Sequence, residues 1–339
     1  MRKKPIRLMI AILIYICFLN LTPEVHSSEI IRNLEKGCYT GVFSGLQTVF
    51  DFEKMVEKKQ AIVLSFTDRW GPPYFFSKDY CKVLWQTNHL PLITWQPQID
   101  IATINEGKWD NYISDWAQSI KEYSYPVMIR WGHEMNGNWY QWGGVNNGGG
   151  EMTGYGDPHK PDGPERYIDA YRYIHDFFER VGAKNVIWVW SPNEGNPIGE
   201  SWNEIENYYP GDDYVNWLGM DGYNWGTSRS WSHWRSFDDI FSDLYRRLSI
   251  LAPDKPIVIA EFASSEEGGN KAQWINDAFQ KIKTAYPRIK VFIWFDIIKE
   301  TSWAVDSSSA SLEAFRKAMQ DPYYVGELQV DITFQNRDK

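Results

Sequence analysis

The chain has 339 residues, a formal net charge of −9 at pH 7, and an aromatic content of 16% that includes 18 Trp and 20 Tyr. An acidic chain without a cluster of Lys or Arg is a poor ligand for nucleic acid, so we expect no nucleic-acid partner. Many amphipathic rings in an acidic protein suit flat hydroxylated ligands such as sugars.

The N-terminal residues have the pattern of a secretory signal. The basic stretch MRKKPIR precedes the apolar run LMIAILIYICFLNL and then VHSS, and we expect cleavage after Ser27. The apolar run is too short for a membrane span. We therefore expect a signal peptide at 1–27, one domain at 28–339, and a secreted or periplasmic monomer that does not contact the membrane after cleavage. Cys38 and Cys81 then remain, and their pairing stays open.

Short hydrophobic runs alternate with helical patterns along the rest of the chain. The runs lie at 37–45, 61–68, 90–97, 125–134, 185–193, 217–224, 256–264 and 290–297. Nearly continuous runs of this kind are typical of parallel strands buried on both faces. Apolar residues at spacings of three and four predict helices at 107–123, 164–182, 236–252 and 270–286, and the helical pattern is weaker after the second and fifth runs.

Eight such runs predict an α/β fold that is a single (β/α)8 TIM barrel. A doubly wound open sheet is the alternative, but the first run, with TGVFSG, lacks the glycine-rich phosphate turn expected there. In a barrel, the residues that end the runs converge on one face, where barrel enzymes keep their sites. These residues are rich in carboxylates and indoles: Trp70, Trp95, Glu134, Asn136, Asn193, Asp221, Tyr223, Glu261, Trp294 and Asp296.

The stretch RWGHEMNGNWYQWG at 130–143 raises the question of what Glu134 does. A zinc protease would need His-Glu-x-x-His, and this chain has Asn136-Gly137 where the second histidine should follow. The zinc-protease hypothesis therefore fails, and we expect no metal and no cofactor.

A pair of carboxylates is the stronger hypothesis. Glu134 ends the fourth run and Glu261 ends the seventh, within VIAEFAS, so a barrel would place them across one mouth. Glycosidic bond cleavage requires one carboxylic acid to protonate the leaving oxygen and a second carboxylate to attack or stabilise the sugar carbon. A lone glutamate at a strand end is more often part of a structural salt bridge, but two such residues favour the glycosidase.

Three long segments resemble glycoside hydrolase family 26. They are RWGHEMNGNWYQWG, GPERYIDAYRYIHDFFERVGAKNVIWVWSPN and IAEFASSEEGGNKAQWI, and the resemblance runs from about Gly37 to about Ser309. It implies a (β/α)8 catalytic domain that hydrolyses polysaccharide with retention of configuration. Glu134 would be the acid/base and Glu261 the nucleophile. Proximity of the negative Glu261 should then raise the pKa of Glu134 and give a bell-shaped pH profile.

The resemblance also implies supporting residues. His133 would bond a sugar hydroxyl or orient a carboxyl, Tyr223 would contact the nucleophile, and Trp294 would floor the sugar that is cleaved. Arg130 would hold a carboxylate, and Asn136 belongs to the same His-Glu-Met-Asn-Gly motif. Each of three residues also has a structural alternative. Tyr223 could be a core residue, Trp294 could pack in the barrel wall, and Arg130 could pair with a structural Asp.

Further indoles are candidate sugar platforms, and about half of them should lie in the core instead. They are Trp70, Trp95, Trp139, Trp142, Trp190, Trp225 and Trp303, to which Tyr140 is added. The glycine-rich stretch 143–163 is long for a loop between a strand and a helix, so we expect it to form a cleft wall or lid, or a mobile surface loop.

The resemblance is closest to the lichenase-like members of the family. Trp131-Gly132 stands where mannanases usually carry Pro-Leu, while Gln96 stands where lichenase-like relatives are expected to have Glu. We expect endo cleavage of β-1,4 linkages in mixed-linkage β-1,3-1,4-glucan, ahead of β-mannan and β-1,3-xylan. The alternative from another class is a catalytically inactive barrel that only binds polysaccharide, which the presence of both carboxylates disfavours.

Overall fold

The computed structural model describes residue 34 and residues 36–45 and 47–329. The expected signal peptide at 1–27 lies outside the described residues. Within them, no helix is long and apolar enough to cross a membrane.

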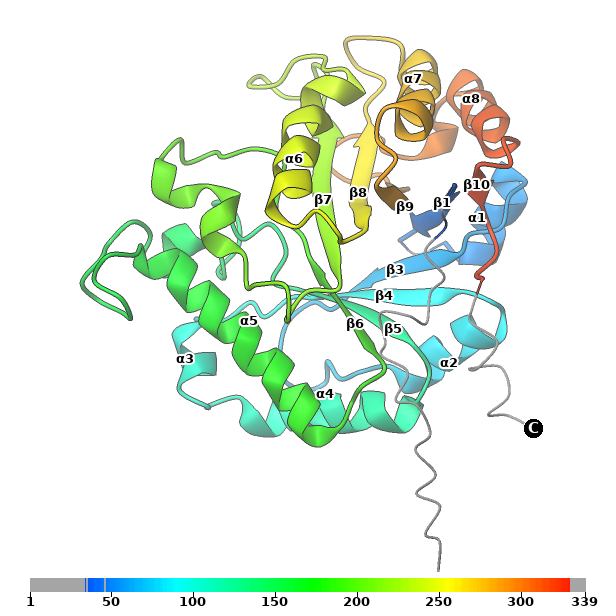
Figure 1. Cartoon of the computed structure of the whole chain (residues 1–339). Helices are drawn as coiled ribbons and strands as arrows, with labels where there is room; N and C mark the ends of the chain where they lie inside the picture. Colours follow the sequence, from blue (N-terminus) through cyan, green and yellow to red (C-terminus); the bar gives the residue numbers. More distant parts are fainter. Residues whose placement is uncertain (1–33, 35, 46, 330–339) are drawn as a thin grey trace, which may run out of the picture.

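Eight parallel strands close into a barrel, as the sequence predicts (Figure 1). The strands are β2 (Gly41–Phe43), β3 (Ile62–Phe66), β4 (Leu90–Trp95), β5 (Val127–Trp131), β6 (Val186–Trp190), β7 (Trp217–Asn224), β8 (Ile257–Ser264) and β9 (Ile289–Phe295). Each strand pairs with the next in the chain, and β9 pairs with both β8 and β2, which closes the sheet. The doubly wound open sheet is therefore excluded.

Two short strands extend the wall beside β9. β1 (Cys38–Tyr39) pairs with β9, with Tyr39 opposite Val291, and β10 (Tyr324–Val325) pairs with β1. The strand that the sequence predicts at 37–45 is therefore divided into β1 and β2. Residues 324–325 add a parallel strand at the edge of the sheet.

Helices surround the strands (Figure 1). They are α1 (Val49–Val56), α2 (Lys78–Gln86), α3 (Ala102–Asn105), α4 (Asp110–Tyr123), α5 (Asp162–Val181), α6 (Phe237–Leu251), α7 (Lys271–Thr284) and α8 (Ser309–Met319). The four predicted helices correspond to α4, α5, α6 and α7. No α-helix follows β6 in the described chain, where two 3-10 helices, Ser201–Asn203 and Ile205–Tyr208, connect it to β7.

The barrel interior and the layer under the helices form separate cores. Ile62, Leu64, Leu92, Val258 and Ile293 are among the residues that fill the interior. Alternate residues of the same strands point outward and pack against the helices, because successive side chains of a strand lie on opposite faces.

Cys38 and Cys81 are both buried free thiols. Cys38 starts β1, whereas Cys81 lies in α2, so each is enclosed by its own neighbours in the outer core. Burial raises the pKa of both thiols, which keeps them protonated and unreactive.

Candidate active site

Arg130 is the centre of a buried cluster at the carboxyl ends of the strands. It lies in β5 with no exposed surface, and it takes its interior position two residues after Met128. Its Nε donates to Thr94 Oγ1 at 2.9 Å, Nη1 donates to Asp221 Oδ1 at 2.7 Å, and Nη2 donates to Glu261 Oε1. A rigid guanidinium can hold two carboxylates at fixed angles in this way, which an ammonium cannot.

Glu261 of β8 is fixed on both oxygens. Oε1 accepts from Arg130, and Oε2 accepts from the Tyr223 hydroxyl at 2.5 Å. Glu261 as a whole is 6% exposed, so it is nearly enclosed. Donors on both oxygens hold the carboxyl group in one orientation. Arg130 and Tyr223 therefore make the carboxylate contacts that the sequence predicts for them.

Glu134 follows β5 in a strained backbone conformation. Its φ is +52°, in the left-handed region that non-glycine residues rarely adopt, and its N–H donates to Ser191 O at 2.7 Å. The side chain is held by two donors, with Asn193 Nδ2 2.8 Å from Oε1 and Trp139 Nε1 2.8 Å from Oε2. The left-handed backbone and the two donors together fix the position of the carboxyl group.

The pKa of Glu134 is raised from 4.5 to about 7. Burial is the largest cause, and the negative charge of Glu261 adds to it, while the donors Asn193 and Trp139 and the cation Arg130 act in the opposite direction. The sequence predicted a rise from Glu261 alone, but desolvation contributes more because only 7% of Glu134 is exposed. Near neutral pH, Glu134 can therefore hold a proton.

His133 is fully buried, and neither ring nitrogen has a hydrogen-bond partner among the described residues. Its Nε2 lies 3.7 Å from Glu261 Oε1, and the ring packs against Phe66, Tyr140 and Trp142. Burial and the nearby Arg130 cation lower the pKa of His133 well below its usual value, so the ring is neutral. The expected contact with a carboxyl is longer than a hydrogen bond.

Asn136 does not contact either glutamate but fixes the loop after β6. Its Nδ2 donates to the carbonyl oxygens of Asn193 and Gly195 at 3.0 and 2.7 Å, and its Oδ1 accepts from Asn193 N at 2.9 Å. Asn193 in turn donates to Glu134. The motif asparagine therefore acts on Glu134 through a neighbour.

The predicted indoles divide into two groups. Trp139 is 46% exposed, and Trp225 is half-buried beside Tyr223, with ring centroids 6.1 Å apart. Trp303 also lies beside Tyr223, at 4.9 Å, but its ring is covered. Trp142 is buried behind Tyr140, stacked at 4.1 Å, and it donates to His133 O at 2.7 Å.

Six predicted platforms are core residues, Trp142 and Trp303 among them, which contradicts the expectation for them. Trp70 and Trp95 stack at 4.6 Å, Trp95 also stacks on Trp116 of α4, and Trp190 packs on Tyr209. Trp294 is fully buried against Phe315 of α8 and Trp274 of α7. Its strand neighbours at 291 and 293 fill the barrel, so position 294 must point outward. Trp294 is a wall residue and not the floor of a sugar site.

The sequence interpretation missed the roles of several residues in this region. Asn193 and Asp221 end two of the predicted strands, but their bonds to Glu134 and Arg130 depend on the loop after β6 and on β7. Phe43, Phe66 and Phe295 form an aromatic group with centroids 4.8 to 6.2 Å apart, and the Arg130 guanidinium lies 5.7 Å above the Phe66 ring. Counting alternate residues from the interior positions 62, 64, 291 and 293 could have placed two of these rings at the mouth.

The glycine-rich stretch 143–163 is folded back on α5. Asn147 donates to Gln141 O and Gly143 O, both at 2.8 Å, and buried Asp162 accepts from Gly154 N at 2.9 Å. A Cβ at Gly163 would lie 2.4 Å from Gly144 O, so only glycine permits this approach. Within the part of the chain that is described, no group of three or more His, Cys, Asp or Glu side chains is placed to hold a metal.

The chain is similar in sequence to known proteins of one family. The model of glycosyl hydrolase family 26 matches residues 95–326. The chain is 36% identical over 319 residues to Endoglucanase H of Acetivibrio thermocellus, an alignment that covers 92% of this chain and 33% of that protein. It is 25% identical over 264 residues to mannan endo-1,4-beta-mannosidase A and B of Caldalkalibacillus mannanilyticus, which covers 76% of this chain and 43% of that protein. The chain thus spans between a third and a half of the length of these relatives.

Solved structures share the fold at low identity. The Bacillus subtilis mannanase man26 aligns with a TM-score of 0.62 and 19% identity, over 89% of this chain and 90% of that one. A family 26 β-mannanase from Bacteroides ovatus aligns with a TM-score of 0.63 and 17% identity, over 89% and 95%. Both likenesses support the (β/α)8 architecture.

Proposed function

Because the chain belongs to glycosyl hydrolase family 26, we propose that it is an endo-β-glycanase that cleaves polysaccharide with retention of configuration. One observation carries the proposal: two carboxyl groups at one end of the barrel have different surroundings. Glu134 is buried with a pKa of about 7, whereas Glu261 accepts from Arg130 and Tyr223. A retaining glycosidase needs this asymmetry of acid and nucleophile.

In the proposed reaction, the Glu134 carboxylic acid gives its proton to the glycosidic oxygen as the bond to the anomeric carbon breaks. A Glu261 oxygen attacks that carbon and forms a glycosyl ester, and the shortened chain leaves as an alcohol. Glu134, now a carboxylate, takes a proton from water, whose oxygen displaces Glu261 from the anomeric carbon. The Tyr223 and Arg130 donors position the nucleophile and stabilise it when it is released as a carboxylate.

His133 is proposed to bind a sugar hydroxyl. It is neutral and fully buried, and its ring nitrogens lack partners among the described residues, a costly state unless a ligand group completes it. A neutral imidazole can donate from one nitrogen and accept at the other.

We propose mixed-linkage β-1,3-1,4-glucan as the substrate, with cleavage at β-1,4 linkages. The relative named an endoglucanase is 36% identical to this chain, whereas the mannan endo-1,4-beta-mannosidase of Caldalkalibacillus mannanilyticus is 25% identical. β-Mannan is the second candidate, because relatives named mannan endo-1,4-β-mannosidase match over up to 76% of the chain.

Three further predictions concern the state of the protein: secretion after cleavage at Ser27, a single domain at 28–339, and a monomer. N-terminal sequencing and light scattering of the exported protein would test them.

The test is the release of reducing ends and the size of products from lichenan, glucomannan, galactomannan and β-1,3-xylan. Wild type is compared with Glu134→Gln and Glu261→Gln on each polymer. We expect rapid cleavage of lichenan and losses of several orders of magnitude in both variants. Preferred cleavage of galactomannan would replace glucan by mannan, and full activity in either variant would refute the assigned roles.

A further inference from the structure

Trp231 is an exposed indole on a well-fixed loop. The ring is 69% exposed, and it lies in the segment between β7 and α6, at the same end of the barrel as Glu261. A single exposed apolar side chain is ordinary, but a contiguous apolar patch marks a binding surface, and Trp231 continues the surface of Trp225. Sequence patterns did not distinguish this residue.

Hydrogen bonds hold the loop in place. Ser232 Oγ donates to Gly226 O and Ser228 Oγ donates to Trp225 O, both at 2.7 Å. Thr227 N donates to Glu267 O at 2.9 Å, and a Cβ at Gly226 would lie only 1.8 Å from that same carbonyl oxygen. The exposure of Trp231 is therefore built into the loop and is not the result of a loose segment.

A continuous row of rings joins Trp231 to the nucleophile. Trp231 lies 5.3 Å from Trp225, Trp225 lies 4.8 Å from Trp303, and Trp303 lies 4.9 Å from Tyr223, whose hydroxyl donates to Glu261. The Arg229 guanidinium, 5.8 Å from the Trp225 ring, donates to Glu300 O and ties this loop to the one after β9. The row of Tyr223, Trp303, Trp225 and Trp231 therefore runs from Glu261 to the solvent-exposed surface.

We propose that Trp231 and Trp225 form a distal subsite for sugar units of a β-linked glycan, beyond the unit that Glu261 attacks. The inference rests on the proposed function for its ligand. The apolar C–H face of a pyranose would stack on the exposed indole, and Trp225 would support that indole from the side. Such a subsite contributes only to chains long enough to reach it.

The first test measures kcat/KM of Trp231→Ala on lichenan and on a series of mixed-linkage oligosaccharides of increasing length. We expect a loss of about 2- to 10-fold on long chains and a smaller loss on the shortest cleaved oligosaccharide. Tyr80→Ala is the matched control, because Tyr80 is 43% exposed on α2 and belongs to no proposed site. Equal losses at every length, or no loss, would overturn the subsite.

The second test measures oligosaccharide binding by calorimetry in the Glu134→Gln background. Weaker binding of long chains after Trp231→Ala supports the subsite even if wild type cleaves nothing, an outcome that would reject only the hydrolase. A wild-type protein that neither cleaves nor binds these glycans would overturn both.

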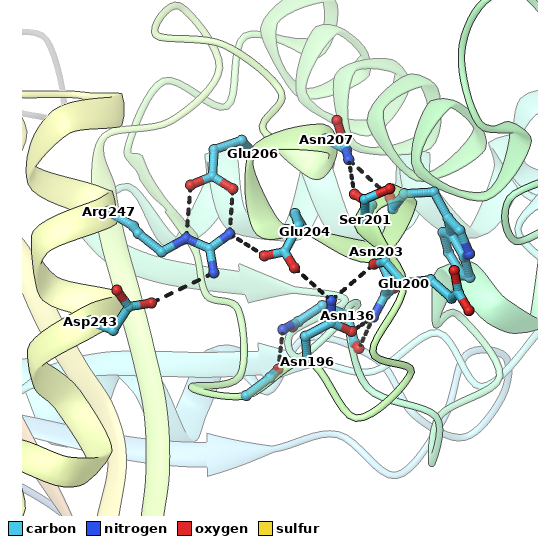
Figure 2. A network of polar contacts seen from close by, with 12 residues as sticks. Asn136, Asn196, Glu200, Ser201, Asn203, Glu204, Glu206, Asn207, Asp243 and Arg247 are labelled. Carbon is cyan, nitrogen blue, oxygen red and sulfur yellow. Dashed lines mark hydrogen bonds and ion pairs between the residues drawn. The ribbon is translucent and has the colours of Figure 1, made fainter.

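A second inference comes from the segment that replaces the helix between β6 and β7. Arg247 of α6 reaches this segment, where its Nε and Nη2 pair with Glu206 and Nη2 also donates to Glu204 at 2.6 Å (Figure 2). Asn196 Nδ2 donates to Glu204 at 2.9 Å, and Asn203 Nδ2 donates to Asn196 Oδ1 at 2.8 Å. Figure 2 shows these residues as one connected network.

The network ends at the proposed acid/base. Buried Asn203 donates from Nδ2 to Asn136 O at 2.7 Å, and its own Oδ1 accepts from Tyr208 at 2.6 Å. Asn136 fixes Asn193, and Asn193 donates to Glu134. A short chain of amides, with Asn203 and Asn136 buried and Asn193 half-buried, therefore connects the anchored segment with one oxygen of Glu134.

We infer that Asn203 is a positioning residue for Glu134, acting through Asn136 and Asn193. Without its amide, the loop that carries Asn193 loses its support, and the donor to Glu134 Oε1 is no longer held at bonding distance. Loss of that donor disfavours the ionised form of Glu134, because hydrogen bonds to a carboxylate stabilise its charge. This inference also rests on the proposed role of Glu134.

The experiment compares the pH profiles of kcat/KM on lichenan for Asn203→Ala and Asn207→Ala. Asn207 is the matched control, since it is an exposed amide of the same segment that bonds only to Ser201 O and Trp202 O in the network. We expect the alkaline limb of Asn203→Ala to move upward by about half a pH unit or more, with a lower kcat, and that of Asn207→Ala to stay in place.

The inference would be overturned if the two variants melt at the same temperature and the alkaline limbs of their pH profiles coincide. Arg247→Met, which breaks the anchor at the surface, keeps the test decisive if Asn203→Ala does not fold. It should move the limb in the same direction by less, and an unchanged limb there would also count against the network. A wild type with no activity on any of the polymers would instead reject the proposed function.

Discussion

Replacing Trp139 with Phe tests how the protein sets the protonation of Glu134. The indole Nε1 donates to Glu134 Oε2 at 2.8 Å, and Phe keeps a ring there without the donor. A hydrogen bond to a charged group is worth about 1.5–3 kcal/mol, and the lower end applies because Trp139 is 46% exposed. About 1.4 kcal/mol corresponds to one pKa unit, so the pKa of Glu134 should rise from about 7 toward 8.

The assay is the pH dependence of kcat/KM on a soluble β-glucan oligosaccharide. The proposed reaction needs protonated Glu134, so a higher pKa moves the alkaline limb to higher pH. The position of the limb, and not the absolute rate, is the readout, because the variant also changes a ring that can contact substrate. A limb that stays in place, or that moves to lower pH, would refute the assignment of this limb to Glu134.

Three other changes separate catalytic from structural roles. Tyr223→Phe removes the donor to Glu261 Oε2 and should lower kcat/KM by about 10- to 100-fold with little change in Tm, and a loss under threefold would argue against this contact. Trp294→Ala should lower the free energy of unfolding by about 3–5 kcal/mol in denaturant melts without a selective rise in KM, as expected for a wall residue; a specific KM effect would restore it as a platform. The folded-state pKa of Glu134 lies above its unfolded value of 4.5, so wild type should lose up to about 3 kcal/mol of stability as pH rises from 4.5 through 7. Calorimetry should find that Glu134→Gln lacks this loss, and parallel stability curves would contradict the raised pKa.

The sequence predicts the barrel well because its strands are continuous apolar runs. All eight were located, and 217–224 agrees with β7 at both ends. The helical pattern after β6 is weak in the sequence, and the structure has no α-helix there among the described residues. The segment that takes its place is held by side chains such as Asn203 and Arg247, whose partners lie far away in the chain. Local periodicity carries no information about such contacts.

The positions of the two glutamates at one end of the barrel were predictable, and the contacts around them were less so. Strand ends placed Glu134 and Glu261 at one mouth, but a run that is apolar on both faces does not say which indole points inward. Trp294 was misplaced for that reason. The left-handed turn at Glu134 could not be foreseen either, since glutamate has no preference for positive φ.

The most direct test of the central claim is to trap the covalent intermediate. The protein is incubated with a 2-deoxy-2-fluoro β-oligoglucoside that carries a dinitrophenolate leaving group, digested with protease and analysed by mass spectrometry. We predict one glycosyl group per chain, attached to the peptide that contains Glu261. A label on another residue, or release of dinitrophenolate without any covalent adduct, would contradict the assignment of Glu261 as the nucleophile.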